Sequence, residues 1–282
     1  MSKTKKVFLI DKLINENWFE NEKEALPWIL SGKVLVNDQK ISSGKEKIPV
    51  DGIIRIKEYY KKRYVNKGGL KLEGALSDFG LDISGKIALD CGASTGGFTD
   101  CLLQHGAKLV YAVDSGNGQL AGKLLINKNV INLERTNLMD GSLKELSPKP
   151  DIITLDLNNM SLRQGVLICK DILKSNGIII ALIKPIYEVE SPEIRRTGNI
   201  NQFDVLKNII CGLCGYFIEN GFDIMGITNS PVRGNADTLE YFVYLDYGRE
   251  TLNNINKSYQ CFVDQITERS FSVKKFQKNN FV

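Results

Sequence analysis

The sequence predicts an α/β protein with a doubly wound, mostly parallel, seven-stranded sheet and a small α+β domain at its N-terminus. The 282 residues are enough for one full α/β domain and one small domain. Beyond Gly69, short apolar runs alternate with helical patterns, which is typical of a parallel sheet covered by helices. The first 60 residues lack this alternation and predict a separate domain.

The N-terminal segment predicts two short helices followed by a hairpin. One helix follows Phe8 and the other lies around Glu22 to Leu30. Valines alternate from Val34 to Val36, and Asn37-Asp38 then favours a tight turn. The last strand of this domain is expected near Ile53 to Ile56.

Seven apolar runs predict the strands of the large sheet. They are Ile87 to Cys91, Leu109 to Val113, Val130 to Leu133, Ile152 to Leu157, Ile178 to Ile183, Phe222 to Thr228 and Leu239 to Leu245. No helical pattern separates the last two runs, so we expect them to pair as antiparallel neighbours at one end of the sheet. The polar residues 249–282 predict a helix or a loose tail.

The net charge of +4 is concentrated near the N-terminus. Residues 1–70 hold 15 Lys and Arg against 9 Asp and Glu, and the remainder holds 22 against 24. This imbalance favours contact of the first domain with a polyanion, although a solvated basic surface has the same charge. The expected organisation is a domain over 1–60, a basic linker over 61–70, a large domain over 71–248 and a tail over 249–282.

Composition also indicates the compartment and argues against metal. The apolar stretch near the start covers only Val7 to Ile10, so neither a signal peptide nor a membrane span is expected. Six scattered cysteines then predict reduced core thiols in the cytoplasm. Cys211 and Cys214 form a single CxxC, and the one histidine is His105, so no metal site is expected.

A glycine-rich loop after the first large-sheet strand predicts a nucleotide-like cofactor. Its sequence is Asp90-Cys-Gly-Ala-Ser-Thr-Gly-Gly-Phe-Thr99, and it leads into a helical pattern. Glycines allow a ligand to approach the backbone closely. Asp114, at the end of the second strand, is suited to accept hydrogen bonds from two ribose hydroxyls.

The spacing of the glycines distinguishes between two kinds of cofactor-binding loop. A dinucleotide fingerprint requires glycine at position 94, which is Ser94 here. The DxGxxxGG spacing instead resembles the first motif of the S-adenosylmethionine-dependent methyltransferases, which have a Rossmann-like sheet. This resemblance implies S-adenosyl-L-methionine as the cofactor and a binding set of Asp90, Gly92, Ser94, Thr95, Gly96, Gly97, Phe98, Asp114, Asn137 and Asp156.

Five segments together resemble one family. They are Tyr64-Val-Asn-Lys-Gly-Gly-Leu-Lys-Leu72, Asp90 to Asp100, Ala112-Val-Asp-Ser-Gly-Asn-Gly-Gln-Leu120, Glu134-Arg-Thr-Asn137 and Ile183-Lys-Pro185. They are similar to the TlyA family, named for haemolysis, of ribosomal RNA 2′-O-methyltransferases with an FtsJ-like catalytic domain. The segment Gly32-Lys-Val-Leu-Val-Asn37 resembles the S-four-type RNA-binding module. The resemblance implies ribosomal RNA or ribosomal subunits as partners; the sequence gives no sign of an oligomeric state.

The same resemblance implies a catalytic quartet of Lys71, Asp156, Lys184 and Glu240. A ribose 2′-hydroxyl is a weak nucleophile and needs a base, and a neutral lysine can serve as one. Burial and a neighbouring ammonium both disfavour a charged lysine. We therefore expect Lys184 to be the base, Lys71 and Glu240 to hold the hydroxyl and the base, and Asp156 to face the methyl donor.

The chain departs from the TlyA pattern in both domains. In the N-terminal module, the family usually has an arginine in each of two short segments, which are Leu9-Ile10-Asp11 and Asn21-Glu22 in this chain. The chain therefore lacks two basic groups that would bind phosphate. In the catalytic half the departures are Leu157 to Ser161, Pro185-Ile-Tyr-Glu188 and Arg195-Arg-Thr-Gly-Asn199. These segments surround the substrate side of the expected cleft, whereas the cofactor half keeps the family pattern, so the resemblance predicts the cofactor and leaves the target nucleotide open.

Two other functions are compatible with parts of the sequence. A non-catalytic RNA-binding or ribosome-assembly protein could keep the cofactor pocket without turnover, but retention of all four quartet residues argues against it. A membrane-lytic protein would follow only from the family's old name. The absence of any apolar span or strongly amphipathic basic helix in the sequence argues against that function.

Overall fold

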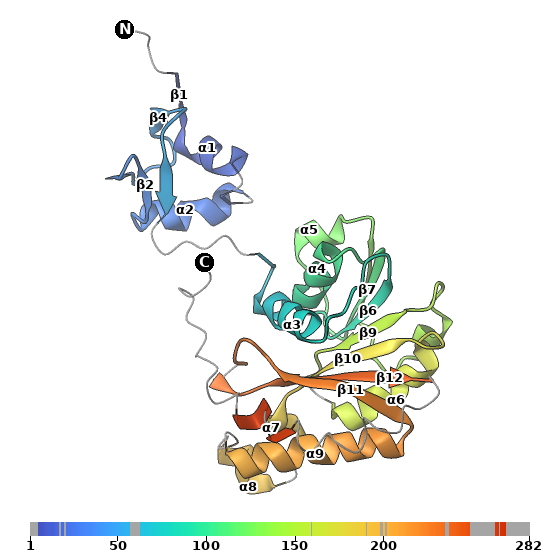
Figure 1. The fold of residues 1–282 in the computed structure, drawn as a ribbon. Coiled ribbons are helices and arrows are strands. Elements are labelled where there is room, and N and C mark those ends of the chain that lie inside the picture. Colours follow the sequence, from blue (N-terminus) through green and yellow to red (C-terminus); the bar gives the residue numbers. More distant parts are fainter. Residues whose placement is uncertain are drawn as a thin grey trace. The chain divides into compact units, whose positions relative to one another are not determined.

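The chain divides into two compact units, one built mainly on residues 1–62 and the other on residues 63–276. The computed structural model describes residues 5–16, 18–19, 21–56, 63–158, 160–189, 191–197, 200, 202–234, 237–248, 263–264 and 266–268 (Figure 1). The predicted linker is therefore described only from residue 63 onward, and most of the predicted tail over 249–282 lies outside the described residues.

The N-terminal unit contains the predicted helices and hairpin. Its elements are α1 (Leu9–Asn15), α2 (Glu22–Leu30), β2 (Val34–Val36), β3 (Gln39–Lys40) and β5 (Ile54–Ile56), with strand order β3-β2-β5. Asn37 and Asp38 have φ of 48° and 64°, the left-handed backbone that a two-residue hairpin turn requires. Leu9, Leu13 and Ile29 from the helices pack with the strand residues in one core.

A second, two-stranded sheet in this unit was not predicted. β1 (Lys6–Phe8) pairs antiparallel with β4 (Lys47–Pro49), and Val7 lies opposite Ile48. Each strand has three residues, of which only Ile48 is buried. A run this short carries no recognisable alternation of buried and exposed residues, so its sequence does not distinguish it from a loop.

The large unit contains the predicted seven-stranded sheet, with strand order β11-β12-β10-β9-β6-β7-β8. Its strands are β6 (Ile87–Cys91), β7 (Leu109–Asp114), β8 (Val130–Glu134), β9 (Ile152–Leu155), β10 (Ile178–Ile183), β11 (Phe222–Asn229) and β12 (Tyr241–Tyr247). Five strands are parallel, and β11 and β12 pair antiparallel at one end, as predicted. The run expected at Leu239 begins as a strand only at Tyr241, and β9 ends at Leu155 instead of Leu157.

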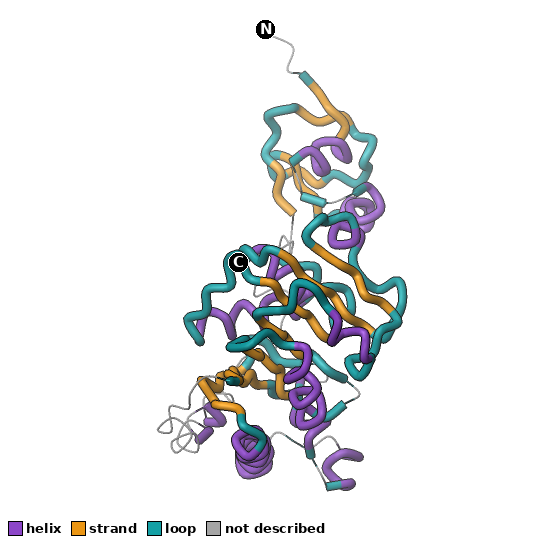
Figure 2. The backbone as a smooth tube through the Cα atoms, turned by 90° about the vertical axis from the view of Figure 1, so that its right-hand side faces the viewer, coloured by secondary structure: helices purple, strands orange, loops and turns teal. Residues whose placement is uncertain are grey.

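Helices cover both faces of this sheet (Figures 1 and 2). They are α3 (Lys67–Asp78), α4 (Gly97–Gln104), α5 (Gly122–Leu125), α6 (Leu162–Ile172), α7 (Pro185–Glu188), α8 (Pro192–Thr197) and α9 (Phe203–Glu219), with a 3₁₀ turn at Gly141–Glu145. Along β10, Ile180 and Leu182 pack in the core beneath α3 and α4. Ile179 and Ile183 pack in the core beneath α6 and α9, because successive strand residues face opposite sides.

The order of the strands creates a crevice between β6 and β9. The chain runs outward from β6 through β7 to β8, and then returns to place β9 on the other side of β6. Cys91 and Leu155 are paired, so the parallel strands β6 and β9 end side by side. In an open α/β sheet this reversal of strand order is where ligands bind.

Candidate active site

The glycine loop follows β6 directly and touches the end of β9. Gly92 has φ of 86°, and a Cβ atom there would lie 2.3 Å from the carbonyl oxygen of Asp156, so only glycine fits. Ser94 has φ of 50°, a conformation that non-glycine residues seldom adopt away from functional sites. The loop is therefore shaped by its contact with the neighbouring strand.

Asp90 supports this loop from inside the protein. Its side chain is fully buried and accepts hydrogen bonds from Thr99 Oγ1 at 2.6 Å and Thr154 Oγ1 at 3.1 Å. Burial disfavours the charged carboxylate and raises the pKa of Asp90 to about 7. The residue does not line the cavity beside the loop, so any effect on a cofactor would pass through the shape of the loop.

Asp114 lies at the end of β7 and fixes the glycine loop from a second side. Its carboxylate accepts from the Ser94 amide at 2.8 Å and from the Gly116 amide at 2.7 Å. An ionised carboxylate offers about four acceptor sites, so about two remain for further donors. This spare capacity fits the two hydroxyls of a ribose.

Asn66 connects the helix α3 to the same loop. Its Oδ1 atom caps α3 by accepting from the Gly68 amide at 2.6 Å, and its Nδ2 atom donates to Thr95 Oγ1 at 2.6 Å. A Cβ atom on Gly97 would lie 2.0 Å from Asn66 Oδ1, so this contact depends on a glycine. The start of α3 and the loop are thus held together, which also fixes the two lysines of α3.

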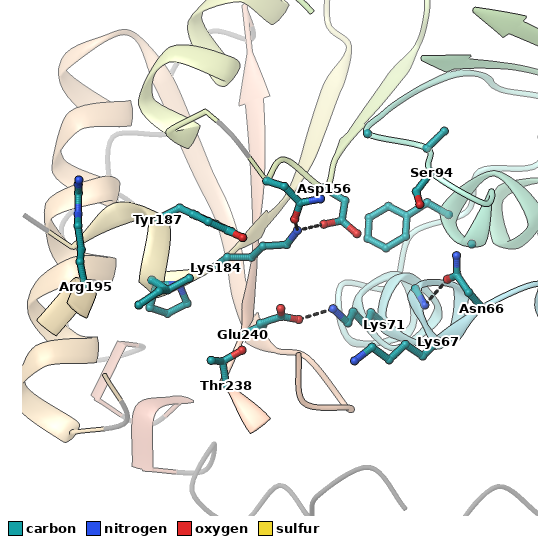
Figure 3. A pocket seen from close by; sticks show the side chains of 18 of the residues that line it. Asn66, Lys67, Lys71, Ser94, Asp156, Lys184, Tyr187, Arg195, Thr238 and Glu240 are labelled. Carbon is teal, nitrogen blue, oxygen red and sulfur yellow. Dashed lines mark hydrogen bonds and ion pairs between the residues drawn. The ribbon is translucent and has the colours of Figure 1, made fainter. Parts of the chain in front are cut away.

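A cavity of about 600 Å³ opens beside the loop (Figure 3). Its walls come from the start of α3, the glycine loop, the ends of β9 and β10, α7, α8 and the segment before β12. The lining residues with polar or aromatic side chains are Asn66, Lys67, Lys71, Ser94, Phe98, Asp156, Asn158, Lys184, Tyr187, Arg195, Arg196, Thr197, Thr238 and Glu240.

Two ion pairs stand in this cavity. Lys71 on α3 contacts Glu240, and their side chains are 6% and 5% exposed. Lys184, directly after β10, contacts Asp156, directly after β9, and also donates to Asn158 Oδ1 at 2.6 Å (Figure 3). All four predicted catalytic residues therefore meet in one place, although they are far apart in the sequence.

The charges of the cavity perturb one another. Burial and the nearby Lys71 ammonium lower the pKa of Lys67, which lies one helical turn before Lys71. Burial raises the pKa of Glu240, and contact with Lys71 opposes this shift in part. A cleft that shifts the pKa values of several ionisable groups is typical of a site for acid–base chemistry.

The structure divides the predicted cofactor residues into two groups. Gly92, Ser94, Gly97, Phe98 and Asp156 line the same cavity as the lysines. The remaining members do not line it: Asp90, Thr95, Gly96, Asp114 and Asn137. Asn137 follows β8, is exposed, and accepts from the Met139 amide at 3.0 Å. Its predicted place near adenine stays a prediction.

Several cavity residues were not predicted. Asn66 and Lys67 belong to the Tyr64 to Leu72 motif, and an asparagine before a helix is a recognisable capping signal. Asn158 follows Asp156 by two residues in an irregular segment, where no periodicity marks it. Tyr187 and Arg195 were not predicted as individual site residues, although their segments were expected on the substrate side of the cleft; they lie on the short helices α7 and α8.

A glycine loop after the first strand, an acidic residue after the second and a seven-stranded sheet that ends in an antiparallel pair define an S-adenosylmethionine-dependent methyltransferase. S-adenosylmethionine is the cofactor of this class, and the glycine cradle and the two unused acceptor sites of Asp114 fit it. The chain belongs to the FtsJ-like methyltransferase family, which matches residues 64–247.

Similarity extends over most of the chain. Hemolysin A of Brachyspira hyodysenteriae is 35% identical over 231 residues, which are 82% of this chain and 95% of that protein. The 16S/23S rRNA (cytidine-2′-O)-methyltransferase TlyA of Mycobacterium tuberculosis is 28% identical, over 83% of this chain and 87% of that protein. A solved structure from Streptococcus thermophilus, named as a hemolysin, is 30% identical with a TM-score of 0.69, over 95% of this chain and 98% of that one.

These relatives carry names of two kinds, hemolysin and methyltransferase. In the described part of the chain, no helix is both long enough and apolar enough to cross a membrane. Among the same residues, no group of three His, Cys, Asp or Glu side chains is arranged to hold a metal ion. The five cysteines that the structure describes are free thiols, and four of them are buried.

Proposed function

We propose that this methyltransferase transfers a methyl group from S-adenosylmethionine to a ribose 2′-hydroxyl of ribosomal RNA. The observation that carries this proposal is the meeting of Lys71, Asp156, Lys184 and Glu240 beside the glycine loop. A relative that covers 83% of the chain is a cytidine-2′-O-methyltransferase acting on ribosomal RNA. Such a substrate would place the activity in the cytoplasm.

The four residues suit the needs of this reaction in different ways. Lys184 lies at the cavity and is our candidate for the base that removes the hydroxyl proton. Asp156 belongs to the segment that touches the glycine loop, which suits a carboxylate facing the methyl donor. Lys71 and Glu240 form the buried pair across the cavity and are suited to orient the hydroxyl.

The cofactor contacts follow from the same geometry. The glycine loop would lie against the amino acid part of S-adenosylmethionine, and Asp114 would accept from its ribose hydroxyls. The bound cofactor supplies an activated methyl group on sulfur. The protein's part is to hold the attacking oxygen in line with that group and to exclude water from it.

The N-terminal unit is suited to bind the RNA. Its segment Gly32 to Asn37 resembles the S-four-type module in sequence, and Lys5, Lys6, Lys40, Lys45 and Lys47 are exposed on it. Lys12 does not belong to this set, because its ammonium is buried against Glu16 and the Val50 carbonyl oxygen. Exposed lysines attract RNA largely independently of its sequence, so this unit would add affinity more than choice of nucleotide.

Methyl transfer to unmodified RNA tests the proposal. The purified full chain would be incubated with methyl-labelled S-adenosylmethionine and with transcribed 16S or 23S ribosomal RNA, and the labelled nucleotide mapped. We expect label on a ribose 2′-oxygen. Label on a base would overturn the ribose assignment. Cofactor binding and RNA binding without transfer would instead favour the non-catalytic RNA-binding protein.

A further inference from the structure

One wall of the cavity consists of α7 and α8, and neither the methyl donor nor the four paired residues account for it. Tyr187 from α7 and Arg195 and Arg196 from α8 line this wall. All three residues are exposed, and Tyr187 is 42% exposed despite its large apolar ring. Aromatic rings and guanidinium groups are the side chains that hold unpaired nucleotides of RNA.

The ring of Tyr187 stands beside the reacting group. Its centroid is 6.0 Å from Lys184 Nζ, on the side of the cavity away from Ser94 and Asn66 (Figure 3). A hydroxyl that hydrogen-bonds to Lys184 would lie about 3 Å from that nitrogen. The base is attached to the neighbouring ribose carbon, and stacked rings have centroids about 4.5 to 7 Å apart. One nucleotide can therefore contact Lys184 through its ribose and Tyr187 through its base.

Arg195 is held in place on this wall. Its Nε atom donates to the Val189 carbonyl oxygen at 2.6 Å, which fixes the guanidinium relative to α7. A guanidinium has five N–H groups, so four others remain to bind a ligand. The helix α8 has no buried residue, so its arginines are not needed to complete a core.

The balance of charge in the cavity favours an anion. Among the described lining residues, five are Lys or Arg and two are Asp or Glu. Lys71 and Lys184 are paired with Glu240 and Asp156, and Arg195 and Arg196 add positive charge on the wall formed by α7 and α8. Phosphate groups on either side of a bound nucleotide would meet this excess.

We propose that Tyr187 stacks on the base of the target nucleotide and that Arg195 and Arg196 bind its neighbouring phosphates, which together hold the ribose against Lys184. This inference rests on the proposed ribose methylation. Arg195 and Arg196 belong to one of the segments in which the chain departs from the TlyA pattern.

Tyr187 variants test the stacking contact. The full-length wild type, Tyr187→Ala and Tyr187→Phe would be compared for methyl transfer to transcribed ribosomal RNA, with S-adenosylmethionine binding measured by calorimetry. We expect Tyr187→Ala to lower kcat/KM by about 5- to 150-fold, the range that base stacking on an aromatic side chain supplies. Tyr187→Phe keeps the ring and should stay within about twofold of the wild type. Cofactor affinity should be unchanged in both.

The arginines are tested by salt dependence. The double variant Arg195→Gln/Arg196→Gln should raise KM for RNA and flatten the fall of log(kcat/KM) with log salt, by about 0.7 to 0.9 for each phosphate that is no longer neutralised. The matched control is Lys108→Gln/Lys128→Gln, which removes two exposed charges of the same unit that do not line the cavity. This control should keep the wild-type slope.

The outcomes separate this inference from the function on which it rests. No methyl transfer by the wild type would overturn both. Wild-type transfer with an active Tyr187→Ala, or a Tyr187→Phe as impaired as Tyr187→Ala, would overturn the stacking contact alone. If the arginine pair and the lysine control change the salt slope equally, the arginines contribute general charge and the phosphate contacts are refuted.

Discussion

The ammonium group of Lys71 on α3 is paired with the carboxylate of Glu240, which lies 169 residues later and just before β12. Both side chains are almost completely buried, at 6% and 5% exposure. A buried charge is tolerated only when its partner is present, because neither group can recover its lost hydration. The pair therefore joins α3 to the antiparallel end of the sheet across the cavity.

Glu240→Gln should destabilise the protein by about 3 to 5 kcal/mol, because it leaves the Lys71 ammonium buried without an anion. The double variant Lys71→Met/Glu240→Gln removes both charges and should recover most of this loss. Urea unfolding followed by circular dichroism measures both free energies. A double variant less stable than Glu240→Gln would mean that the two side chains stabilise the fold independently.

Asp114→Ala should weaken S-adenosylmethionine binding by about 1.5 to 3 kcal/mol, because the cofactor ribose would lose a charged acceptor. The loop would also lose the hydrogen bonds that Asp114 accepts from Ser94 and Gly116. Titration calorimetry measures the dissociation constant. Asp82→Ala is the matched control, since Asp82 also accepts from a backbone amide, that of Ser84 at 2.9 Å, away from the cavity. An unchanged dissociation constant in Asp114→Ala would remove this residue from the site.

Removal of residues 1–62 should leave cofactor binding intact and reduce RNA affinity. The deletion follows the boundary between the two compact units and removes most of the basic excess of residues 1–70. Fewer neutralised phosphates also mean a shallower dependence of affinity on salt. Filter binding of transcribed ribosomal RNA at several salt concentrations tests this. Equal affinity of the two proteins would show that the N-terminal unit is not the anchor.

Asp90 should make the protein less stable as the pH rises from about 4 to about 7. Burial raises the folded-state pKa of this carboxyl to about 7, whereas an unfolded Asp titrates near 3.9. The folded state therefore binds more protons in this window, and stability falls until the group ionises in both states. Each unit of pKa difference corresponds to about 1.4 kcal/mol, so a loss of a few kcal/mol is the upper limit.

The variant Asp90→Asn isolates this contribution. It keeps the shape of the side chain between Thr99 and Thr154 but does not titrate. Urea unfolding gives the free energy of unfolding of the wild type and of Asp90→Asn at pH 5 and pH 8. The other ionisable groups are the same in both proteins, so the difference between their pH profiles reports on Asp90. We expect the wild type to lose more stability than Asp90→Asn between these values. If the free energies of unfolding of the two proteins change with pH in parallel, the raised pKa of Asp90 is contradicted.

The sheet was predictable because its strands are buried on both faces. Runs such as Ile178 to Ile183 are continuously apolar, and the lack of a helical pattern after Phe222 to Thr228 was enough to predict the antiparallel pair. The sheet formed by β1 and β4 was missed because three-residue strands leave no such pattern.

The site was predictable only where a motif marks it. The glycine loop and the quartet lie in recognisable segments, so their positions followed from order along the chain. The pairing of Lys71 with Glu240, and of Lys184 with Asp156, depends on which strand ends become neighbours. Tyr187, Arg195 and Asn158 carry no periodic signal. Their segments were expected on the substrate side only because they depart from the TlyA pattern, and the fold brings the three side chains to one cavity.

Lys184→Ala should abolish most methyl transfer to ribosomal RNA while leaving cofactor binding nearly unchanged. A positioned base contributes about 10² to 10⁴ in rate, whereas a lysine that only contacts phosphate contributes mainly affinity. Single-turnover transfer and calorimetry separate the two effects. Lys174→Ala is the matched control, because Lys174 also pairs with an aspartate next to a strand, Asp151 at 2.8 Å, outside the cavity. This control should transfer at the wild-type rate.

The variant Lys184→Arg distinguishes two roles of Lys184, a base that accepts the hydroxyl proton and a side chain that supplies only positive charge. Arginine can keep the ion pair with Asp156, but a guanidinium does not give up its proton near neutral pH. If Lys184 accepts the hydroxyl proton, Lys184→Arg should be as inactive as Lys184→Ala despite normal cofactor affinity. Near wild-type turnover of the arginine variant would show that position 184 supplies only positive charge. The proton would then have to leave by another group, and Lys67, whose pKa is lowered by burial and by Lys71, would be the next lysine to replace.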